Sequence, residues 1–295
     1  MTKPALRIMA ARHSAFYSPL IAAMAAGFLE SEGFDATYQV LPPGGRSHEL
    51  IRAGAVDIVQ SAVSSSWGLL EQGLTDLPAH FVQINQRDGF FLTAREPDPA
   101  FHWRKLEGRT LLADHAFQPL AMLKYAAHCQ GVDWSRLQVE DAGGVEEIDA
   151  AFRAGRGDYV HQQGPAAQQI ERDGVGQVVA SAGEAMPAVA FSSLQASRDF
   201  LKTESARAFR RAYGRARAWV QQAPAAEIAG AEARYFPGID REALTAAIAR
   251  YQALGCWQGG TEIQRALYDQ ALEVFLHCGA IPRRYRYEEV VAELA

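Results

Sequence analysis

The chain has 295 residues, of which 48% are hydrophobic and 21% are charged, and its formal net charge is -5. This composition is typical of a globular protein and leaves no basic surface for nucleic acid. No apolar run reaches the roughly eighteen residues that cross a membrane, so we expect neither a nucleic-acid partner nor a membrane-spanning segment.

The first segment, MTKPALRIMA, is predicted to enter a strand almost at once. A secretory leader would show a basic stretch followed by a long apolar one, and this segment shows neither. The three cysteines, Cys129, Cys256 and Cys278, lack metal-ligand spacing and are typical of a reducing compartment. As written, the chain is predicted to be cytoplasmic, and a periplasmic location is the alternative if a leader was removed.

The first structural unit begins with the strand LRIMA and a polar loop. A helix then starts near Pro19, because proline is favoured in the first helical turn. The segment LPPGG precedes a second helix that ends in the letters RAG, and VDIVQ forms the next strand. This alternation predicts parallel strands joined by helical crossovers.

A second unit repeats the same plan from TLLAD onward. Pro119 again opens a helix, a double glycine again precedes the next one, and FRAGRGDYVH (152–161) resembles IRAGAVDIVQ (51–60). We therefore predict two α/β lobes built on similar plans. The repeated residues Asp57 and Asp158 fall at the end of the strands opposite the expected ligand site, so we interpret them as turn or capping residues.

Two extended apolar runs, 79–94 and 186–200, are predicted to cross between the lobes. The prolines of EPDP (96–99) open the inserted segment, since they interrupt regular structure. The predicted organisation has three parts: residues 1–92 begin lobe 1, residues 93–187 form an inserted lobe 2, and residues 188–295 provide the return crossing and the helices that complete lobe 1.

Several motifs together resemble a known family: HSAFYSPLIAAMAAGFLESEGFD, LPPGG, IRAGAVDI, LEGRTLLAD, SSLQASRDFL and RYQALGCWQGG. They resemble type II periplasmic-binding-protein folds, in the sulfonate, nitrate, taurine and thiamine-pyrimidine-precursor (hydroxymethylpyrimidine-synthase-like) group of ABC transporter substrate-binding proteins. The resemblance covers essentially the whole chain. It implies a two-lobed α/β fold with an interlobe cleft and a helical C-terminal segment packed on lobe 1. It also implies a small anionic or heteroaromatic ligand that is handed to an ABC transporter permease.

Ligands of open α/β sheets bind outside the carboxyl ends of the strands. In this chain that rule selects the loops after the predicted strands, and the same loops also hold Arg12, Ser14, Asp114 and Gln162. The predicted ligand-binding residues are His13, Phe16, Tyr17, Gly44, Gly45, Arg46, Ser64, Ser65, His115, Phe117, Gln118, His161, Gln163 and Gly164.

Helix N-termini in these loops can hold a carboxylate, a sulfonate or a phosphate through unpaired N–H groups. Arg46 can add a bidentate contact to such an anion. Phe16 and Tyr17 can sandwich a flat ring, whereas Trp67 is expected in the core. These residues fit an aromatic carboxylate, a sulfonate and a pyrimidine equally well.

Four histidines, His13, His48, His115 and His161, lie in or beside the predicted cleft loops, with Asp114 nearby. Two imidazoles and a carboxylate can bind a divalent metal, but no HxH or HxxxH spacing is present. We therefore expect neutral histidines that hydrogen-bond a ligand, with no metal and no cofactor.

The predicted function is a small-molecule binding protein that closes two lobes around its ligand, like the solute-binding component of an ABC importer. No GxSxG, HExxH or P-loop motif occurs, and none of the four lysines falls at a predicted strand end of the cleft. Two alternatives stay open. One is an enzyme in the same cleft, hydroxymethylpyrimidine-synthase-like or decarboxylase-like, and the other is a cytoplasmic ligand sensor.

Overall fold

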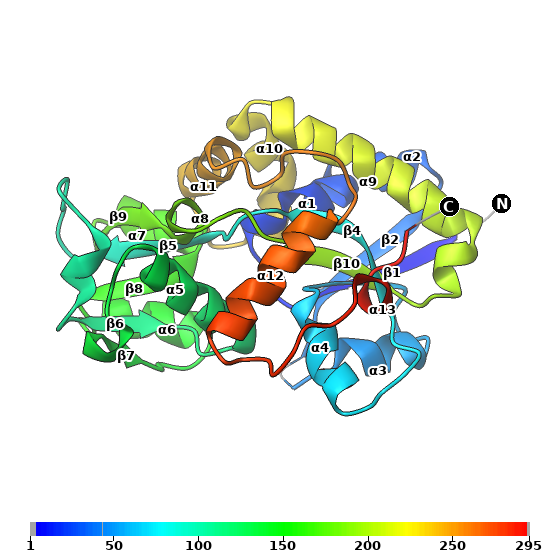
Figure 1. Cartoon of the computed structure of the whole chain (residues 1–295). Coiled ribbons are helices and arrows are strands. Elements are labelled where there is room, and N and C mark those ends of the chain that lie inside the picture. Colours follow the sequence, from blue (N-terminus) through cyan, green and yellow to red (C-terminus); the bar gives the residue numbers. More distant parts are fainter. Residues whose placement is uncertain (1–3, 43, 294–295) are drawn as a thin grey trace.

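The computed structural model describes residues 4–42 and 44–293 and contains two five-stranded sheets (Figure 1). The first sheet has the strand order β2-β1-β3-β10-β4. Strand β1 is parallel to β2 and β3, and β10 is antiparallel to both of its neighbours. Its strands are β1 Ala5–Ala10, β2 Asp35–Val40, β3 Ile58–Ser61, β4 Ala79–Asn85 and β10 Ser192–Ala196.

The second sheet has the order β7-β6-β8-β5-β9 and repeats this arrangement. Strand β6 is parallel to β7 and β8, and β5 is antiparallel to both of its neighbours. Its strands are β5 Phe90–Ala94, β6 Thr110–Ala113, β7 Gln138–Glu140, β8 Tyr159–Gln163 and β9 Gln177–Ser181.

The predicted two-lobed α/β fold is confirmed by the matching strand orders. The twin sequences supply β3 in one sheet and β8 in the other, each in the third position. Strands β10 and β5, one on each crossing run, occupy the same fourth position. Below, lobe 1 is the sheet containing β1 with its helices, and lobe 2 is the sheet containing β6 with its helices.

The chain crosses between the sheets twice. It leaves β4 at Asn85 and enters β5 at Phe90, so the predicted run 79–94 is two strands in different sheets. Gly89 lies in this crossing, and a Cβ there would lie 2.4 Å from the ring of Phe16. The return crossing joins α8 to β10. We propose that the lobe boundaries lie at these two crossings, close to the predicted limits of 92 and 187.

Helices cover both sheets and follow the repeated plan. In lobe 1 they are α1 Ser18–Ala25, α2 Phe28–Ser31, α3 Ser47–Arg52 and α4 Ser64–Glu71. In lobe 2 they are α5 Phe117–Cys129, α6 Val145–Arg153, α7 Ala166–Arg172 and α8 Ala182–Ala185. Of the helices formed by residues 4–42 and 44–293, none combines the length and the apolar character needed to cross a membrane.

The C-terminal helices contact both lobes, whereas the sequence predicted packing on lobe 1. Helices α9 and α10 pack on α1, but α11 packs on α7 and α12 on α5 (Figure 1). Phe275 of α12 contacts Trp67 of lobe 1 and Phe117 of lobe 2, with ring centroids 5.0 and 4.9 Å apart. These aromatic contacts explain the difference, because α12 has apolar partners on both sides. The bounds are α9 Glu204–Gln222, α10 Ala225–Glu232, α11 Arg241–Ala253, α12 Arg265–His277 and α13 Tyr287–Val290.

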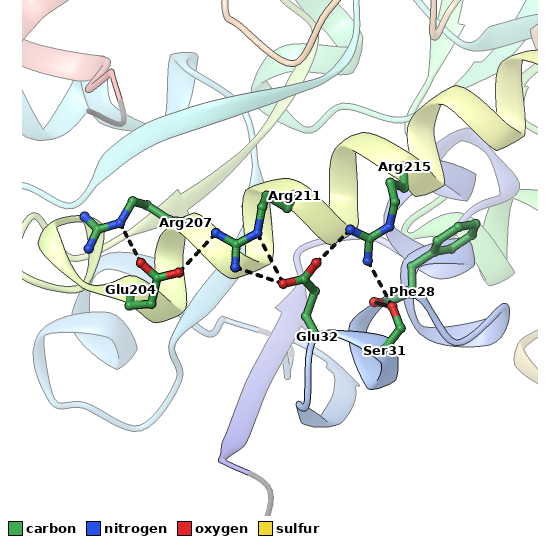
Figure 2. A network of polar contacts seen from close by, with 7 residues as sticks. All are labelled: Phe28, Ser31, Glu32, Glu204, Arg207, Arg211 and Arg215. Atoms are coloured by element: carbon green, nitrogen blue, oxygen red, sulfur yellow. Dashed lines mark hydrogen bonds and ion pairs between the residues drawn. The ribbon is translucent and has the colours of Figure 1, made fainter.

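Helix α9 is joined to the end of α2 by a charged surface network (Figure 2). Glu32 accepts hydrogen bonds from Arg211 and Arg215, with N–O distances of 2.9 and 2.7 Å. Water screens such exposed pairs, so they contribute little to stability. Beside them, the rings of Phe28 and Trp219 lie 6.0 Å apart. We attribute the position of α9 chiefly to apolar packing of this kind.

Asp57 and Asp158 lie at the start of their strands and away from the ligand site, as the sequence predicted, but each binds the neighbouring strand instead of acting as a turn or capping residue. Asp57 accepts a hydrogen bond from the backbone N–H of Arg7 at 2.8 Å and pairs with the Arg7 guanidinium at 2.7 Å. Asp158 accepts the backbone N–H of Thr110 at 2.8 Å. The aspartates therefore fix the start of β3 against β1 in lobe 1 and the start of β8 against β6 in lobe 2.

Candidate functional site

The carboxyl ends of β1, β3, β6 and β8 border two adjoining cavities between the lobes. The large compartment has a volume of about 330 Å³ and the small compartment about 50 Å³. Arg12, Phe90 and Gln163 line both, so the two form one cleft. Ligand pockets for small molecules commonly measure about 300–1,000 Å³, so the large compartment is of suitable size.

The large compartment combines aromatic walls with amide and hydroxyl groups. Its aromatic residues are Tyr17, Phe90, Phe117 and Phe191. Its polar side chains include Gln60, Ser61, Ser64, Ser65, Gln118, Gln163 and Ser192. This mixture suits a flat molecule with hydrogen-bonding groups at its edge.

A hydrogen bond joins the lobes at the wall of the large compartment. Ser64 at the start of α4 donates to the side-chain oxygen of Gln118 at 2.6 Å. The amide nitrogen of Gln118 donates in turn to the carbonyl of Phe191 at 2.8 Å. Both α4 and α5 begin at this wall, which places helix N-termini at the cleft as the sequence predicted.

The small compartment lies against the loop that follows β8. Ser14 of lobe 1 donates a hydrogen bond to the carbonyl of Gly164 in lobe 2 at 2.5 Å. The N–H of Gly164 donates to the hydroxyl of Tyr251 at 2.7 Å, and that hydroxyl donates to the carbonyl of Gly89 at 3.0 Å. The backbone around Gly164 is therefore fixed from both lobes and from α11.

His161 is the outstanding polar group of the small compartment. His161 is 1% exposed, and neither of its ring nitrogens has a hydrogen-bond partner. Its ring stacks on Phe90 with centroids 4.4 Å apart. Burial lowers the pKa of His161 to about 3, so the ring is neutral and offers one donor and one acceptor. Buried polar groups normally have partners, so a ligand is the natural partner here.

His13 also lines the small compartment, but both of its ring nitrogens are in use. They contact the hydroxyl of Tyr38 at 2.8 Å and the carbonyl of Tyr235 at 2.7 Å. The ring stacks on Phe236 with centroids 4.5 Å apart, and burial lowers the pKa of His13. His13 therefore forms a wall of the cleft rather than a free hydrogen-bonding group.

Gln163 connects the compartments and retains a free acceptor. Its amide nitrogen donates to the hydroxyl of Tyr17 at 3.3 Å, which links the two lobes. Its side-chain oxygen is buried without a partner. Burial also raises the pKa of Tyr17, so this hydroxyl stays protonated at neutral pH. The cleft thus holds unused hydrogen-bonding capacity on both His161 and Gln163.

An ion pair between Arg12 and Asp114 joins the lobes at the boundary of the two compartments. The side chains are 22% and 9% exposed. The guanidinium carbon of Arg12 also lies over the ring of Phe90, 5.7 Å from its centroid. Both residues lie within two positions of a strand end, β1 for Arg12 and β6 for Asp114.

The structure brings most of the predicted ligand-binding residues together. Of those predicted, the ones that line the two compartments are His13, Tyr17, Ser64, Ser65, Phe117, Gln118, His161, Gln163 and Gly164.

Two predicted residues lie outside the cleft although they follow cleft strands. Phe16 is fully buried, with its ring 5.2 Å from that of Phe191 and 5.1 Å from that of Tyr251. It therefore supports the wall from behind. His115 turns its Nδ1 to the carbonyl of Ala113 at 2.9 Å and lines neither compartment.

The double-glycine loop of lobe 1 also lies outside the cleft. Gly44, Gly45 and Arg46 line neither compartment. Arg46 is 69% exposed as a side chain and pairs with Glu49 at 3.2 Å. This loop follows β2, which is the outermost strand of its sheet, so it lies away from the central strands that border the cleft.

Several lining residues were not predicted from the sequence: Gln60, Phe90, Phe191 and Ser192. Gln60 was identifiable, since the twin sequences align it with His161. Phe90 and Phe191 belong to the crossing runs, where an apolar residue that faces a ligand has the same pattern as a core residue. No sequence signal distinguishes the two cases.

The four candidate histidines do not converge on one point. His48 lies in α3, where its Nε2 is 3.9 Å from Glu49, and His115 bonds to its own loop. His13 uses both ring nitrogens in protein contacts. Within residues 4–42 and 44–293, no three His, Cys, Asp or Glu side chains form a group that could hold a metal ion.

Comparison with known protein families shows the family to which this chain belongs. A family model described as NMT1/THI5 like matches residues 15–227, which is more than half of the chain. The chain belongs to this family. The resemblance inferred from the sequence motifs is thereby confirmed.

A curated relative and solved structures agree with this assignment. “Putative binding protein YtlA” of Bacillus subtilis (strain 168) is 27% identical over 294 residues, covering 97% of this chain and 87% of the relative. A ligand binding component of an ABC-type import system from Staphylococcus aureus is similar with a TM-score of 0.76 at 12% identity, covering 98% and 97% of the two chains. The periplasmic aliphatic sulphonate binding protein SsuA from Escherichia coli gives 0.73 at 15% identity, covering 98% and 97%. At these identities the solved structures establish the shared fold.

Proposed function

We propose that the protein is a small-molecule binding protein that encloses an anionic or heteroaromatic ligand between its lobes, as the solute-binding component of an ABC importer does. The observation that carries this proposal is the buried His161, which lines the small compartment and has two ring nitrogens without hydrogen-bond partners. The unpartnered oxygen of Gln163 adds a second acceptor nearby. A ligand that satisfies these groups removes the cost of burying them unpaired.

The ligand binds with its ring between the aromatic walls of the large compartment. Phe90 and Phe117 lie on lobe 2 and Tyr17 on lobe 1, so a ring held there contacts both lobes. A hydrogen-bonding substituent extends into the small compartment and meets His161. Since both lobes contact the ligand, binding favours the closed arrangement.

The chemistry of the cleft favours binding over catalysis. A histidine whose pKa is about 3 is a weak base at neutral pH, where general-base catalysis needs a pKa near the ambient pH. His161 therefore acts as a hydrogen-bonding group in this proposal.

The names of similar proteins support an importer role. YtlA is named a binding protein, and the Staphylococcus aureus structure is named a component of an import system. We propose an ABC permease as the partner of this protein. We also propose that this protein is located in the periplasm, as the name of SsuA states for that protein. Cell fractionation tests this location.

The proposal is tested by native mass spectrometry of the purified protein, followed by mass analysis after denaturation. We expect a small organic compound that stays bound in the folded protein and is released intact on unfolding. Adding this compound to stripped protein at a hundredfold excess over its Kd stabilises the fold by about 2.7 kcal/mol. Chemical conversion of the compound by the protein, or a tightly bound cofactor in its place, would contradict the proposal.

A further inference from the structure

The Arg12–Asp114 pair determines the charge of the cleft. Among the described residues that line the two compartments, these two carry the formal charges, and they have opposite sign. Burial lowers the pKa of both lining histidines, His13 and His161, so neither adds a positive charge at neutral pH. The remaining polar groups are amides and hydroxyls. The cleft is therefore electrically balanced before any ligand enters.

Asp114 is held in place by its own loop as well as by Arg12. One carboxylate oxygen accepts the N–H of Ala116 at 2.8 Å, and the other pairs with Arg12. The first contact fixes the carboxylate in the turn that leads into α5. An anionic ligand that approaches Arg12 is therefore repelled by the Asp114 carboxylate, whose orientation is fixed by these two contacts.

Arg12 is in turn held in the position that an anion would need. Its backbone N–H donates to the side-chain oxygen of Gln60 at 3.2 Å, and its guanidinium lies over Phe90. A planar guanidinium beside an aromatic cleft is a common receptor for carboxylates and sulfonates. In this chain Asp114 already occupies that receptor.

We propose that Asp114 is a specificity-determining residue that makes the cleft reject anions and accept uncharged ligands. This inference rests on the proposed function and narrows its ligand class from anionic or heteroaromatic to uncharged heteroaromatic molecules. Asp114 supplies the like charge that discriminates against anions, and the unpartnered side-chain oxygen of Gln163 supplies neutral recognition.

The test compares benzamide with benzoate, which share a ring and a planar shape but differ in charge. Calorimetric titration measures their affinity for the wild type and for Asp114→Asn. The asparagine keeps an oxygen that can accept the Ala116 N–H, so the turn is retained. We expect the variant to bind benzoate about tenfold or more tighter than the wild type does, because Arg12 is freed. Benzamide affinity should change by less than about threefold.

Two further variants locate the effect. In Arg12→Gln/Asp114→Asn the gained benzoate affinity should disappear, since the receptor guanidinium is gone. Arg46→Gln is the matched control, because Arg46 is an exposed arginine of the same lobe outside the cleft, and it should bind benzoate as the wild type does. Thermal melts establish that every variant is folded.

Absence of a benzoate gain in folded Asp114→Asn would overturn the proposal, and so would a gain that survives the loss of Arg12. This failure is distinct from failure of the proposed function. If native mass spectrometry finds a bound compound while the benzoate gain is absent, the inference that Asp114 rejects anions is wrong and the proposed binding function still holds.

Discussion

Polar groups are paired differently at the edge of a sheet where its parallel strands begin and at the edge where these strands end. At the edge where the parallel strands begin, Asp57 and Asp158 bind the neighbouring strand, and Arg95 donates to the carbonyl of Gly157 at 2.7 Å. At the edge where the strands end, His161 and Asp88 keep buried atoms without partners. The first edge stabilises the fold, and the second holds hydrogen-bonding capacity in reserve.

Stability is given up for binding at the edge where the strands end. An unpartnered buried polar atom costs about 1–3 kcal/mol, and native proteins tolerate few of them. The unpartnered nitrogens of His161 and oxygen of Gln163 gather at the interlobe cleft, where a ligand can supply the missing partners. The following variants test whether the two edges differ in this way, in order of expected effect.

The largest effect is expected at Asp88, between β4 and β5. It is 0% exposed, one carboxylate oxygen accepts the N–H of Phe90 at 2.6 Å, and the other has no partner. Burial raises the pKa of Asp88 from 3.8 to about 7. The folded protein therefore binds an extra proton between about pH 4 and pH 7, and the free energy of unfolding falls as pH rises through this window.

Asp88→Asn keeps an acceptor for Phe90 and removes this titration. We expect the variant to gain on the wild type as pH rises, by up to about 4 kcal/mol above pH 7, since one pKa unit corresponds to about 1.4 kcal/mol. Denaturant unfolding at pH 5, 6, 7 and 8 measures the difference. Asp35→Asn, at an exposed aspartate, is the control. A constant difference between Asp88→Asn and the wild type across this range would contradict the prediction.

At the opposite edge, Asp57→Ala should cost stability and leave binding intact. The change removes the ion pair with Arg7 and the acceptor of the Arg7 N–H, so we expect a loss of about 1–2 kcal/mol in the free energy of unfolding. Asp158→Ala should cost less, because its nearest arginine contact, to Arg109, is 3.7 Å long. Denaturant unfolding measures both, and the co-purified ligand should be retained. If either variant lost its ligand while its stability stayed unchanged, this edge of the sheet would belong to the binding site.

His161→Phe should have the opposite effects on stability and binding. Phenylalanine keeps the stacking on Phe90 and removes two unpartnered nitrogens, so we expect the ligand-free protein to gain about 1 kcal/mol and to lose its co-purified compound.

His80→Phe is the matched control for this variant. His80 is equally buried, and burial lowers its pKa to about 3 as well, but its nitrogens contact Ser66 at 3.3 Å and Ser193 at 2.8 Å. We expect it to lose about 1–3 kcal/mol and to keep its ligand. Equal stability changes in the two variants would show that the unpartnered state of His161 has no special meaning.

The repeated plan of the fold could be predicted because it depends on periodic and local signals. The twin sequences, the helix-opening prolines and the double glycines recur in order, and each has a local cause in backbone conformation. The contacts of α12 with both lobes were not predictable. An amphipathic helix shows which face is buried, but the sequence does not show that the partners of Phe275 come from two lobes.

The cleft was predictable near the carboxyl ends of the inner strands β3, β6 and β8, where Ser64, Gln118 and His161 lie. It was not predictable where strand order matters, since the sequence does not state that β2 is an edge strand. For that reason Arg46 was expected at the ligand.

The smallest effect is therefore expected for Arg46→Gln. Its partner Glu49 is 60% exposed, and water competes with their contact at 3.2 Å. Stability should change by less than about 0.5 kcal/mol, as is usual for surface substitutions. Native mass spectrometry should find the same compound at the same occupancy as in the wild type. Lost occupancy would mean that the loop after β2 closes over the ligand. The binding site would then include a loop of the outermost strand as well as the loops of the inner strands.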